Sequence, residues 1–224
     1  MPQIFPRGSN LVPLQIILVI GALSTMAMGA VFYFWTPKYT RVGYQPAQPI
    51  PFSHKIHAGQ LQMDCRACHT FVETAAHSNI PTAQACMNCH SQVQKDNPKL
   101  APLREAFETG KPVQWVQIHK TPDYVYFNHS VHINRGVSCV ACHGRVDQMD
   151  VVYHAESHAM KFCLDCHRAP ENHLRPLDKV TDLGWVAPTT GKQTKQQAQI
   201  ELGTKLKEQR GVNPAVSNCA GCHR

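Results

Sequence analysis

All ten cysteines of this 224-residue chain fall into five pairs with the spacing C-x-x-C, and a histidine directly follows each pair. Two thiols at this spacing can add to the two vinyl groups of one porphyrin, while the next residue supplies an imidazole to the iron. The pattern therefore predicts five covalently attached haem c groups. The predicted thioether residues are Cys65, Cys68, Cys86, Cys89, Cys139, Cys142, Cys163, Cys166, Cys219 and Cys222, and the predicted proximal ligands are His69, His90, His143, His167 and His223.

Other uses of paired cysteines fit the sequence less well than haem attachment. Histidine makes up 14 of the 224 residues, so chance would place one after all five pairs in roughly one such chain in a million, which disfavours bare C-x-x-C motifs. Zinc would require closed tetrahedra of four ligands, and five identical pairs do not divide into such sites. A disulfide framework would give the histidines no role. Haem attachment is the strongly favoured interpretation.

The excess of basic residues does not indicate nucleic-acid binding. The polypeptide has a formal charge of +7, but five haems bring about ten propionate charges and would lower the net charge to about −3. We therefore expect most basic side chains to serve as partners for propionates, and no nucleic-acid partner.

Residues 11–36 contain no charged side chain, and they are long enough to cross a membrane. A span needs about 20 apolar residues, whereas the apolar region of a cleaved signal peptide has about 7–15. Tyr33 and Trp35 suit the membrane interface. We expect a retained transmembrane helix over 11–36, with residues 1–10 as a cytoplasmic N-terminus, rather than a cleaved signal.

The orientation of this helix follows from the cofactor and not from charge. Arg7 lies on one side of the segment and Lys38 and Arg41 on the other, so the positive-inside rule barely distinguishes the two orientations. Haem c is attached on the outer face of the bacterial membrane. The sequence thus predicts a single-pass protein of the bacterial cytoplasmic membrane, with its haem domain on the periplasmic face.

The region beyond the membrane contains a duplication. An F-x-H-x-x-H motif begins at Phe52 and again at Phe127, each motif is followed by two C-x-x-C-H motifs, and the halves are offset by 74 to 77 residues. Such a period indicates a repeated two-haem unit. The predicted segments are a proline-rich tether at 37–51, a first dihaem module at 52–126, a second dihaem module at 127–173, and a C-terminal segment with the fifth haem at 174–224.

Secondary-structure signals are sparse. Leu100, Leu103 and Phe107 have helical spacing before Gly110, and residues 193–210 form a polar helix candidate that Gly203 weakens. We expect a mainly α protein with much irregular coil. Because few residues are available for each haem, the porphyrins themselves should form the core.

Nine histidines outside the attachment motifs are available as second axial ligands for five irons. The two F-x-H-x-x-H motifs offer four of them in repeated context, because histidines three apart share a helical face. His54, His57, His129 and His132 are therefore the predicted distal ligands of four haems.

The fifth distal ligand is less well determined by the sequence. His119 is the first choice because it directly precedes the second module. Met160 is the rival, since a thioether ligand raises the potential of haem c relative to two histidines, although a lone methionine is often core filler. His77 and His154, each nine residues before a haem cysteine, are second-rank candidates as ligands or propionate partners.

Four segments together resemble a known family, the pentahaem cytochrome c subunit of bacterial alternative complex III. They are FSHKIHAGQLQMDCRACHT, CMNCHSQ, HKTPDYVYFNHSVHINRGVSCVACHGRVDQMD and MKFCLDCHR. The resemblance covers residues 50–170, and the single anchor and fifth haem agree with it, whereas residues 174–218 match nothing. The F-x-H-x-x-H motifs also occur in the broader cytochrome c3/c7 group.

The resemblance implies a non-catalytic subunit that relays electrons within a quinol:acceptor oxidoreductase, in respiration or photosynthesis, toward a periplasmic carrier or oxidase. It also implies an iron–sulfur subunit, quinol-binding polytopic membrane subunits and a monohaem cytochrome c as partners. Two alternatives stay open, a multihaem enzyme acting on a small nitrogen compound and a free-standing membrane-anchored quinol dehydrogenase. The surplus of spare histidines disfavours an enzyme, which would need an iron with an open coordination position.

Overall fold

The computed structural model describes residues 5–35, 41–214 and 216–223. The chain divides into two compact units, residues 1–42 and residues 43–224. Residues 1–4 of the expected cytoplasmic N-terminus, Thr36 at the end of the expected transmembrane segment, and residues 37–40 of the expected tether lie outside the described residues.

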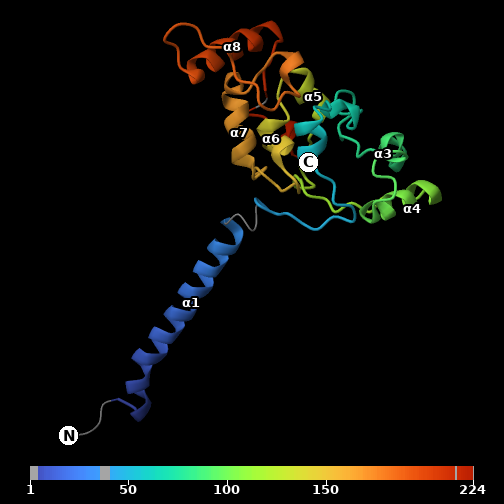
Figure 1. The fold of residues 1–224 in the computed structure, drawn as a ribbon. Helices are drawn as coiled ribbons and strands as arrows, with labels where there is room; N and C mark the ends of the chain where they lie inside the picture. The colour runs from blue at the N-terminus through green and yellow to red at the C-terminus, as the bar shows by residue number, and fades with distance from the viewer. Residues whose placement is uncertain (1–4, 36–40, 215, 224) are drawn as a thin grey trace. The chain divides into compact units, whose positions relative to one another are not determined.

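The first unit consists of one long apolar helix. A short 3₁₀ turn, η1 (Arg7–Leu11), leads into α1 (Val12–Trp35) (Figure 1). Residues 8–34 have a mean hydropathy of 2.1, and none of this stretch is buried inside the protein. A helix of 24 residues is about 36 Å long, enough to cross a hydrocarbon core about 30 Å thick. Among the described residues, α1 alone has the length and composition of a membrane span.

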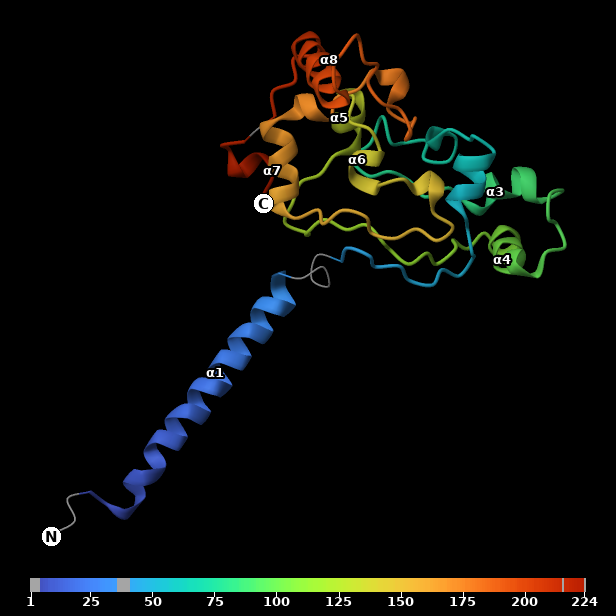
Figure 2. The ribbon, with the colours of Figure 1, turned by 60° about the vertical axis from the view of Figure 1, so that its left-hand side comes forward.

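The second unit is built from short helices joined by irregular segments (Figures 1 and 2). No strand occurs in the described residues; two isolated bridges, Val125 with His223 and Val137 with Leu174, are the only β pairing there. The prediction of a mainly α protein is confirmed. The elements are η2 (Lys55–Gln60), η3 (Cys65–Ala67), α3 (Ala83–His90), η4 (Pro98–Leu100), α4 (Ala101–Thr109), α5 (His129–Asn134), α6 (Val140–His143), η5 (Val146–Gln148), α7 (Met160–Arg168), η6 (Pro170–Asn172), η7 (Leu177–Lys179), α8 (Lys195–Gln209) and η8 (Cys219–Gly221).

The two helices predicted from periodicity are both present. α4 ends where expected, because Gly110 adopts the left-handed conformation with φ of 68°. α8 begins with a capping box, in which Thr194 and Gln197 exchange side-chain and backbone hydrogen bonds. Gly203, which weakened the sequence prediction, has a packing role: a Cβ at this position would overlap the backbone carbonyl of Glu171.

The apolar core of the second unit is small. Twelve hydrophobic residues are buried in the described part of the chain, too few to organise 182 residues by apolar packing alone. The largest buried group joins Val72, Ile133 and Val180, with Cys139 packed against it. These residues come from the first module, the second module and the C-terminal segment, so the three parts share one contact point.

The C-terminal segment, whose residues 174–218 take no part in the family resemblance, is attached to the second module. Gln199 on α8 donates to the carbonyls of Glu171 and Leu174 at 3.1 and 2.9 Å. Arg210, just after α8, donates to the carbonyls of Arg135 and Arg175 at 3.0 and 2.7 Å. The bonds to Glu171 and Arg135 attach the C-terminal segment to the second module, and those to Leu174 and Arg175 join two parts of the segment itself.

Candidate haem-binding sites

Each C-x-x-C-H motif forms a single helical turn. In three motifs the histidine N–H bonds the carbonyl of the first cysteine: His69 to Cys65 at 2.8 Å, His143 to Cys139 at 2.9 Å and His223 to Cys219 at 2.8 Å. The other two motifs lie within α3 and α7. Residues i, i+3 and i+4 share a helix face, so each motif presents its two sulfurs and its imidazole on the same side, as haem attachment requires.

The alternatives to haem find no support in the arrangement of the cysteines. All ten lie in the described residues and none forms a disulfide. Within the described chain, no three His, Cys, Asp or Glu side chains are grouped as they would be to bind a bare metal ion. Zinc would need such a group of closely spaced ligands.

The two F-x-H-x-x-H motifs have the same local geometry. The first phenylalanine meets the first histidine edge-on, with ring centroids 4.8 Å apart for both Phe52–His54 and Phe127–His129. The same phenylalanine stacks on the second histidine, His57 at 4.4 Å and His132 at 4.8 Å. The backbones differ, since the first motif begins a π-helical turn and the second an α-helix.

Several imidazoles are fixed by a hydrogen bond at Nδ1. His57 Nδ1 lies 2.8 Å from the carbonyl of Ser53, and His132 Nδ1 lies 2.7 Å from the carbonyl of Asn128, the equivalent position in the repeat. A carbonyl selects the tautomer with a proton on Nδ1 and leaves Nε2 available for a metal. The same bond is made by His69 to Asn79 at 2.7 Å, His90 to Val93 at 2.9 Å and His129 to Ala76 at 2.9 Å.

Two pairs of imidazoles have the separation that an iron between them demands. Metal–nitrogen bonds of about 2 Å on opposite sides of an iron place the two ring centres about 6 Å apart. The centroids of His57 and His90 are 6.2 Å apart, and those of His132 and His167 are also 6.2 Å apart. The residues around the second and fourth motifs therefore fit a haem with two histidine ligands.

His54 lies beside the first motif. Burial, followed by the charge of His69, lowers the pKa of His54 to about 4. Its Nδ1 is buried and has no hydrogen-bond partner among the described residues. Metal binding requires the neutral imidazole, and the burial of His54 favours that form.

Four imidazoles gather around His143 of the third motif. The rings of His129 and His158 are both 6.4 Å from that of His143, the separation expected across an iron. His119 is closer, at 4.3 Å, and fully buried His154 lies against His119 and His158 at 5.2 and 4.7 Å. Burial, then His119, holds the pKa of His143 well below its usual value.

The sequence did not single out His158, and its neighbours along the chain gave no repeated spacing that would have done so. It has a left-handed backbone, with φ of 46°, and its Nε2 lies 3.1 Å from the carbonyl of Cys142. His77, a second-rank candidate, is exposed and lies near His129, whose pKa it helps to lower after burial.

Two comparisons with known proteins show the group to which the chain belongs. Residues 50–109 match the family of cytochrome c7 and related cytochromes c. Over 171 residues the chain is 31% identical to the menaquinone reductase, multiheme cytochrome c subunit, of Nitratidesulfovibrio vulgaris, covering 66% of this chain and 80% of that protein. This chain belongs to the multihaem cytochromes c. Its cysteines thus carry covalent haem c.

The attachment motifs of this multihaem cytochrome c follow one another in space in a different order from the sequence. Burial raises the pKa of Cys68, and the charge of Cys89 contributes to this shift. The thiols of Cys65 and Cys139 interact with each other, which lowers the pKa of Cys65 and raises the pKa of Cys139. Burial, with Cys166 and Cys163, raises the pKa of Cys142 to about 12. Burial and the neighbouring Cys222 raise the pKa of Cys163. Neighbouring thiols thus join the motifs into a spatial series, in the order second, first, third, fourth and fifth.

The fifth motif of the cytochrome is held by the segment that precedes the second module. Tyr126 donates its N–H to the carbonyl of Cys222 at 2.8 Å, and Val125 forms a bridge with His223. The ring of Tyr124 lies 5.8 Å from that of His223 and is tilted by 28°. Within the described residues, this is the one aromatic or imidazole ring beside His223.

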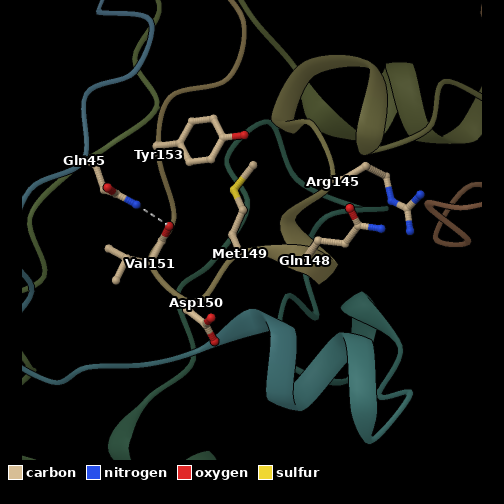
Figure 3. Close-up of a pocket in the computed structure, with 7 residues that line it drawn as sticks. All are labelled: Gln45, Arg145, Gln148, Met149, Asp150, Val151 and Tyr153. Carbon is tan, nitrogen blue, oxygen red and sulfur yellow. Dashed lines mark hydrogen bonds between the residues drawn. The ribbon is translucent and has the colours of Figure 1, made fainter.

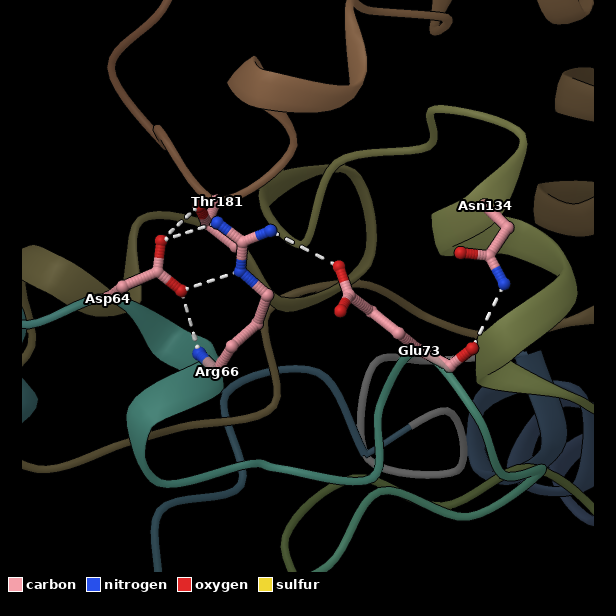
Figure 4. Close-up of polar contacts among 5 residues, drawn as sticks. All are labelled: Asp64, Arg66, Glu73, Asn134 and Thr181. Atoms are coloured by element: carbon pink, nitrogen blue, oxygen red, sulfur yellow. Dashed lines mark hydrogen bonds and ion pairs between the residues drawn. The ribbon is translucent and has the colours of Figure 1, made fainter.

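A polar network surrounds the first motif of the cytochrome (Figure 4). Arg66, between the two cysteines, bonds Asp64 at 2.9 Å and Glu73 at 3.2 Å. Thr181 of the C-terminal segment donates to Asp64 at 2.7 Å, and Asn134 donates to the carbonyl of Glu73 at 2.9 Å. The hydrogen bond from Arg66 holds the pKa of Asp64 well below its usual value.

A pocket of about 430 Å³ has a mixed polar and apolar lining (Figure 3). It is bordered by Gln45, whose side chain donates to the carbonyl of Val151 at 2.8 Å, and by Arg145, which is already paired with Asp147 at 2.6 Å. None of the ten cysteines or candidate axial ligands lines this pocket.

Proposed function

We propose that this multihaem cytochrome c is the membrane-anchored pentahaem subunit of a quinol-oxidising complex of the alternative complex III type. It would relay electrons along its haems toward a periplasmic carrier or oxidase. The observation that carries the proposal is the spatial series of attachment motifs, in which each motif has a thiol near a thiol of the next.

Haem c, when bound, supplies reversible one-electron oxidation and reduction. The residues of the chain supply the rest. Paired imidazoles such as His57 with His90 and His132 with His167 fit six-coordinate iron, which favours electron transfer over catalysis at an open site. Carbonyls bonded to Nδ1 keep the rings oriented.

The partners and location form part of the same proposal. The apolar helix α1 fits a single-pass anchor, and the attachment of haem c on the outer face of bacterial membranes supports a periplasmic location for the second unit. By resemblance to alternative complex III, we expect an iron–sulfur subunit, quinol-binding polytopic membrane subunits and a monohaem cytochrome c in the same assembly.

Purification from native membranes tests this proposal. We expect these partners to co-purify. For the subunit separated from them, we expect pyridine haemochrome quantitation to give five haems per chain and electron paramagnetic resonance to show low-spin iron throughout. Four or fewer haems, or a dominant high-spin signal that responds to nitrite or cyanide, would instead favour a multihaem enzyme. Purification of the protein without partners, but with quinol dehydrogenase activity, would favour the free-standing quinol dehydrogenase.

In a second candidate function, the electrons flow in the opposite direction, toward a quinone. The relative from Nitratidesulfovibrio vulgaris is named a subunit of a menaquinone reductase, which suggests delivery of electrons to a quinone. Steady-state assays of the purified complex separate the two. Quinol-driven reduction of an oxidised c-type carrier supports our proposal, whereas turnover only from a reduced haem donor to a menaquinone analogue supports the second candidate.

A further inference from the structure

We infer that Met160 is the second axial ligand of the haem attached at Cys219 and Cys222, opposite His223. This inference rests on the proposed five-haem relay and adds a ligand to it. It begins with a difference between the fifth motif and the other four.

The histidines outside the motifs are unevenly distributed. His69, His90, His143 and His167 each have at least one such histidine nearby, namely His54, His57, His129 and His132 in turn. The surplus histidines His119, His154 and His158 all gather at His143. In the described chain, His223 has only the ring of Tyr124 beside it. Histidine therefore serves the first four motifs and not the fifth.

Met160 is placed where the fifth motif approaches α7. It is the first residue of α7, one turn before Cys163, and residues i and i+3 share a helix face. Cys222 lies close enough to Cys163 to help raise its pKa. Figure 2 shows the C-terminal segment beside α7. The helix that begins at Met160 and the fifth motif are thus neighbours in the structure.

The side chain of Met160 does not behave as core filler, which would be its ordinary role. It is 60% exposed, although it is apolar and sits on a helix that carries three haem-binding residues. A thioether is an established axial ligand of haem c. The exposure leaves its sulfur free to bind.

Other side chains that could supply a ligand are poor competitors. The ring of Tyr124 is 5.8 Å from that of His223, closer than a tyrosine that bound the iron through its phenolic oxygen would be, because that oxygen lies further from its ring centre than Nε2 does in histidine. The amine of Lys161 is paired with Asp165 at 2.5 Å, and that of Lys120 with Asp123 at 3.4 Å. His119, the first choice from the sequence, has its ring 4.3 Å from His143.

Histidine–methionine ligation raises the potential of haem c above that of bis-histidine ligation. The fifth motif also stands at one end of the spatial series of motifs. The haem of highest potential would therefore occupy one terminus of the relay.

The test uses the full-length holoprotein separated in detergent from its partner subunits, so that the expected monohaem cytochrome c does not contribute, with near-infrared magnetic circular dichroism and a redox titration. We expect the wild type to show the sulfur-to-iron charge-transfer band and one component at higher potential than the other four. Met160→Ala should abolish the band and create one high-spin iron. Met160→His should abolish the band, keep all iron low-spin and move that component down among the others. Met63→Ala, an exposed methionine two residues before Cys65, is the matched control and should retain the band.

A wild type without the band, or a Met160→Ala protein that keeps it, would overturn the assignment. Pyridine haemochrome quantitation on each variant reports the proposed function separately. Five haems without the band would reject Met160 alone, whereas fewer than five would reject the pentahaem relay itself.

Discussion

At the scale of single residues, the two nitrogens of an axial histidine have different tasks. In His57, Nδ1 lies 2.8 Å from the carbonyl of Ser53. This bond orients the ring and leaves Nε2 available for an iron, and the ring centroid lies 6.2 Å from that of His90. Attachment of the haem depends on the cysteines alone. Loss of one such histidine should therefore change the iron without releasing the haem.

We predict that His57→Ala turns one of the five haems high-spin while the haem count is unchanged. The measurement is electron paramagnetic resonance combined with pyridine haemochrome quantitation. His173→Ala is the control, since His173 lies at the end of η6 and was not predicted to be a ligand. A fully low-spin His57→Ala protein would show that another residue binds this iron.

We predict that Asp64→Asn lowers the free energy of unfolding at neutral pH by about 0.5 kcal/mol, the range for a half-exposed ion pair. Arg66 depresses the pKa of Asp64, so the stabilisation is present above the unfolded pKa of about 4. It is lost as the pH falls through the lower folded value. Denaturant unfolding of the holoprotein from neutral to acid pH should show the two proteins converging.

Asp178→Asn is the matched control, because Asp178 is 73% exposed and pairs only with its neighbour Lys179. Its unfolding should match that of wild type across the same pH range. If Asp64→Asn and wild type differ equally at all pH values, the charge of Asp64 is not the source of the stability.

At the scale of elements, α8 shows what periodicity can and cannot predict. The apolar spacing of Ala198, Leu202 and Leu206 was enough to predict the helix, and two of these side chains are buried. Gly203 weakens the prediction of this helix from the sequence, because helix propensity includes only the local cost of a glycine. The contact between Gly203 and the carbonyl of Glu171 is tertiary and has no local signature.

We predict that Gly203→Ala destabilises the protein, although alanine is the better helix former by about 1 kcal/mol. Overpacking against a backbone carbonyl should cost about 1–3 kcal/mol and exceed that gain. Thermal unfolding measures the difference. Thr204→Ala, one residue further along at an exposed position, should unfold close to wild type, and a raised Tm for Gly203→Ala would contradict the contact.

The features of the candidate sites also divide into local patterns, which the sequence predicts, and tertiary contacts, which it does not. Attachment motifs and F-x-H-x-x-H pairs are local patterns, and the structure gives them the expected helical turns. The gathering of His119, His154 and His158 around His143 depends on how distant loops meet. So does the spatial order of the motifs, because Cys65 and Cys139 lie 74 residues apart in the sequence. Spacing within one sequence contains no information on such contacts.

At the scale of the whole molecule, we predict that the mature protein keeps its apolar N-terminal helix. α1 has 24 residues and no buried face within its unit, which suits lipid on all sides. The intact mass of protein extracted from membranes decides the matter. A chain beginning near residue 30 or later would contradict the prediction and require another means of membrane attachment.

The nearness of the Cys65 and Cys139 thiols has a consequence for biogenesis. Folding of the bare polypeptide would bring these two sulfurs, from different halves of the chain, close enough to influence each other's ionisation. In an oxidising compartment, neighbouring thiols become cross-linked, and a cross-linked pair can no longer receive porphyrin. Attachment of the porphyrins before these two thiols meet would avoid that side reaction, so we expect the maturation machinery to act on the chain ahead of this native contact.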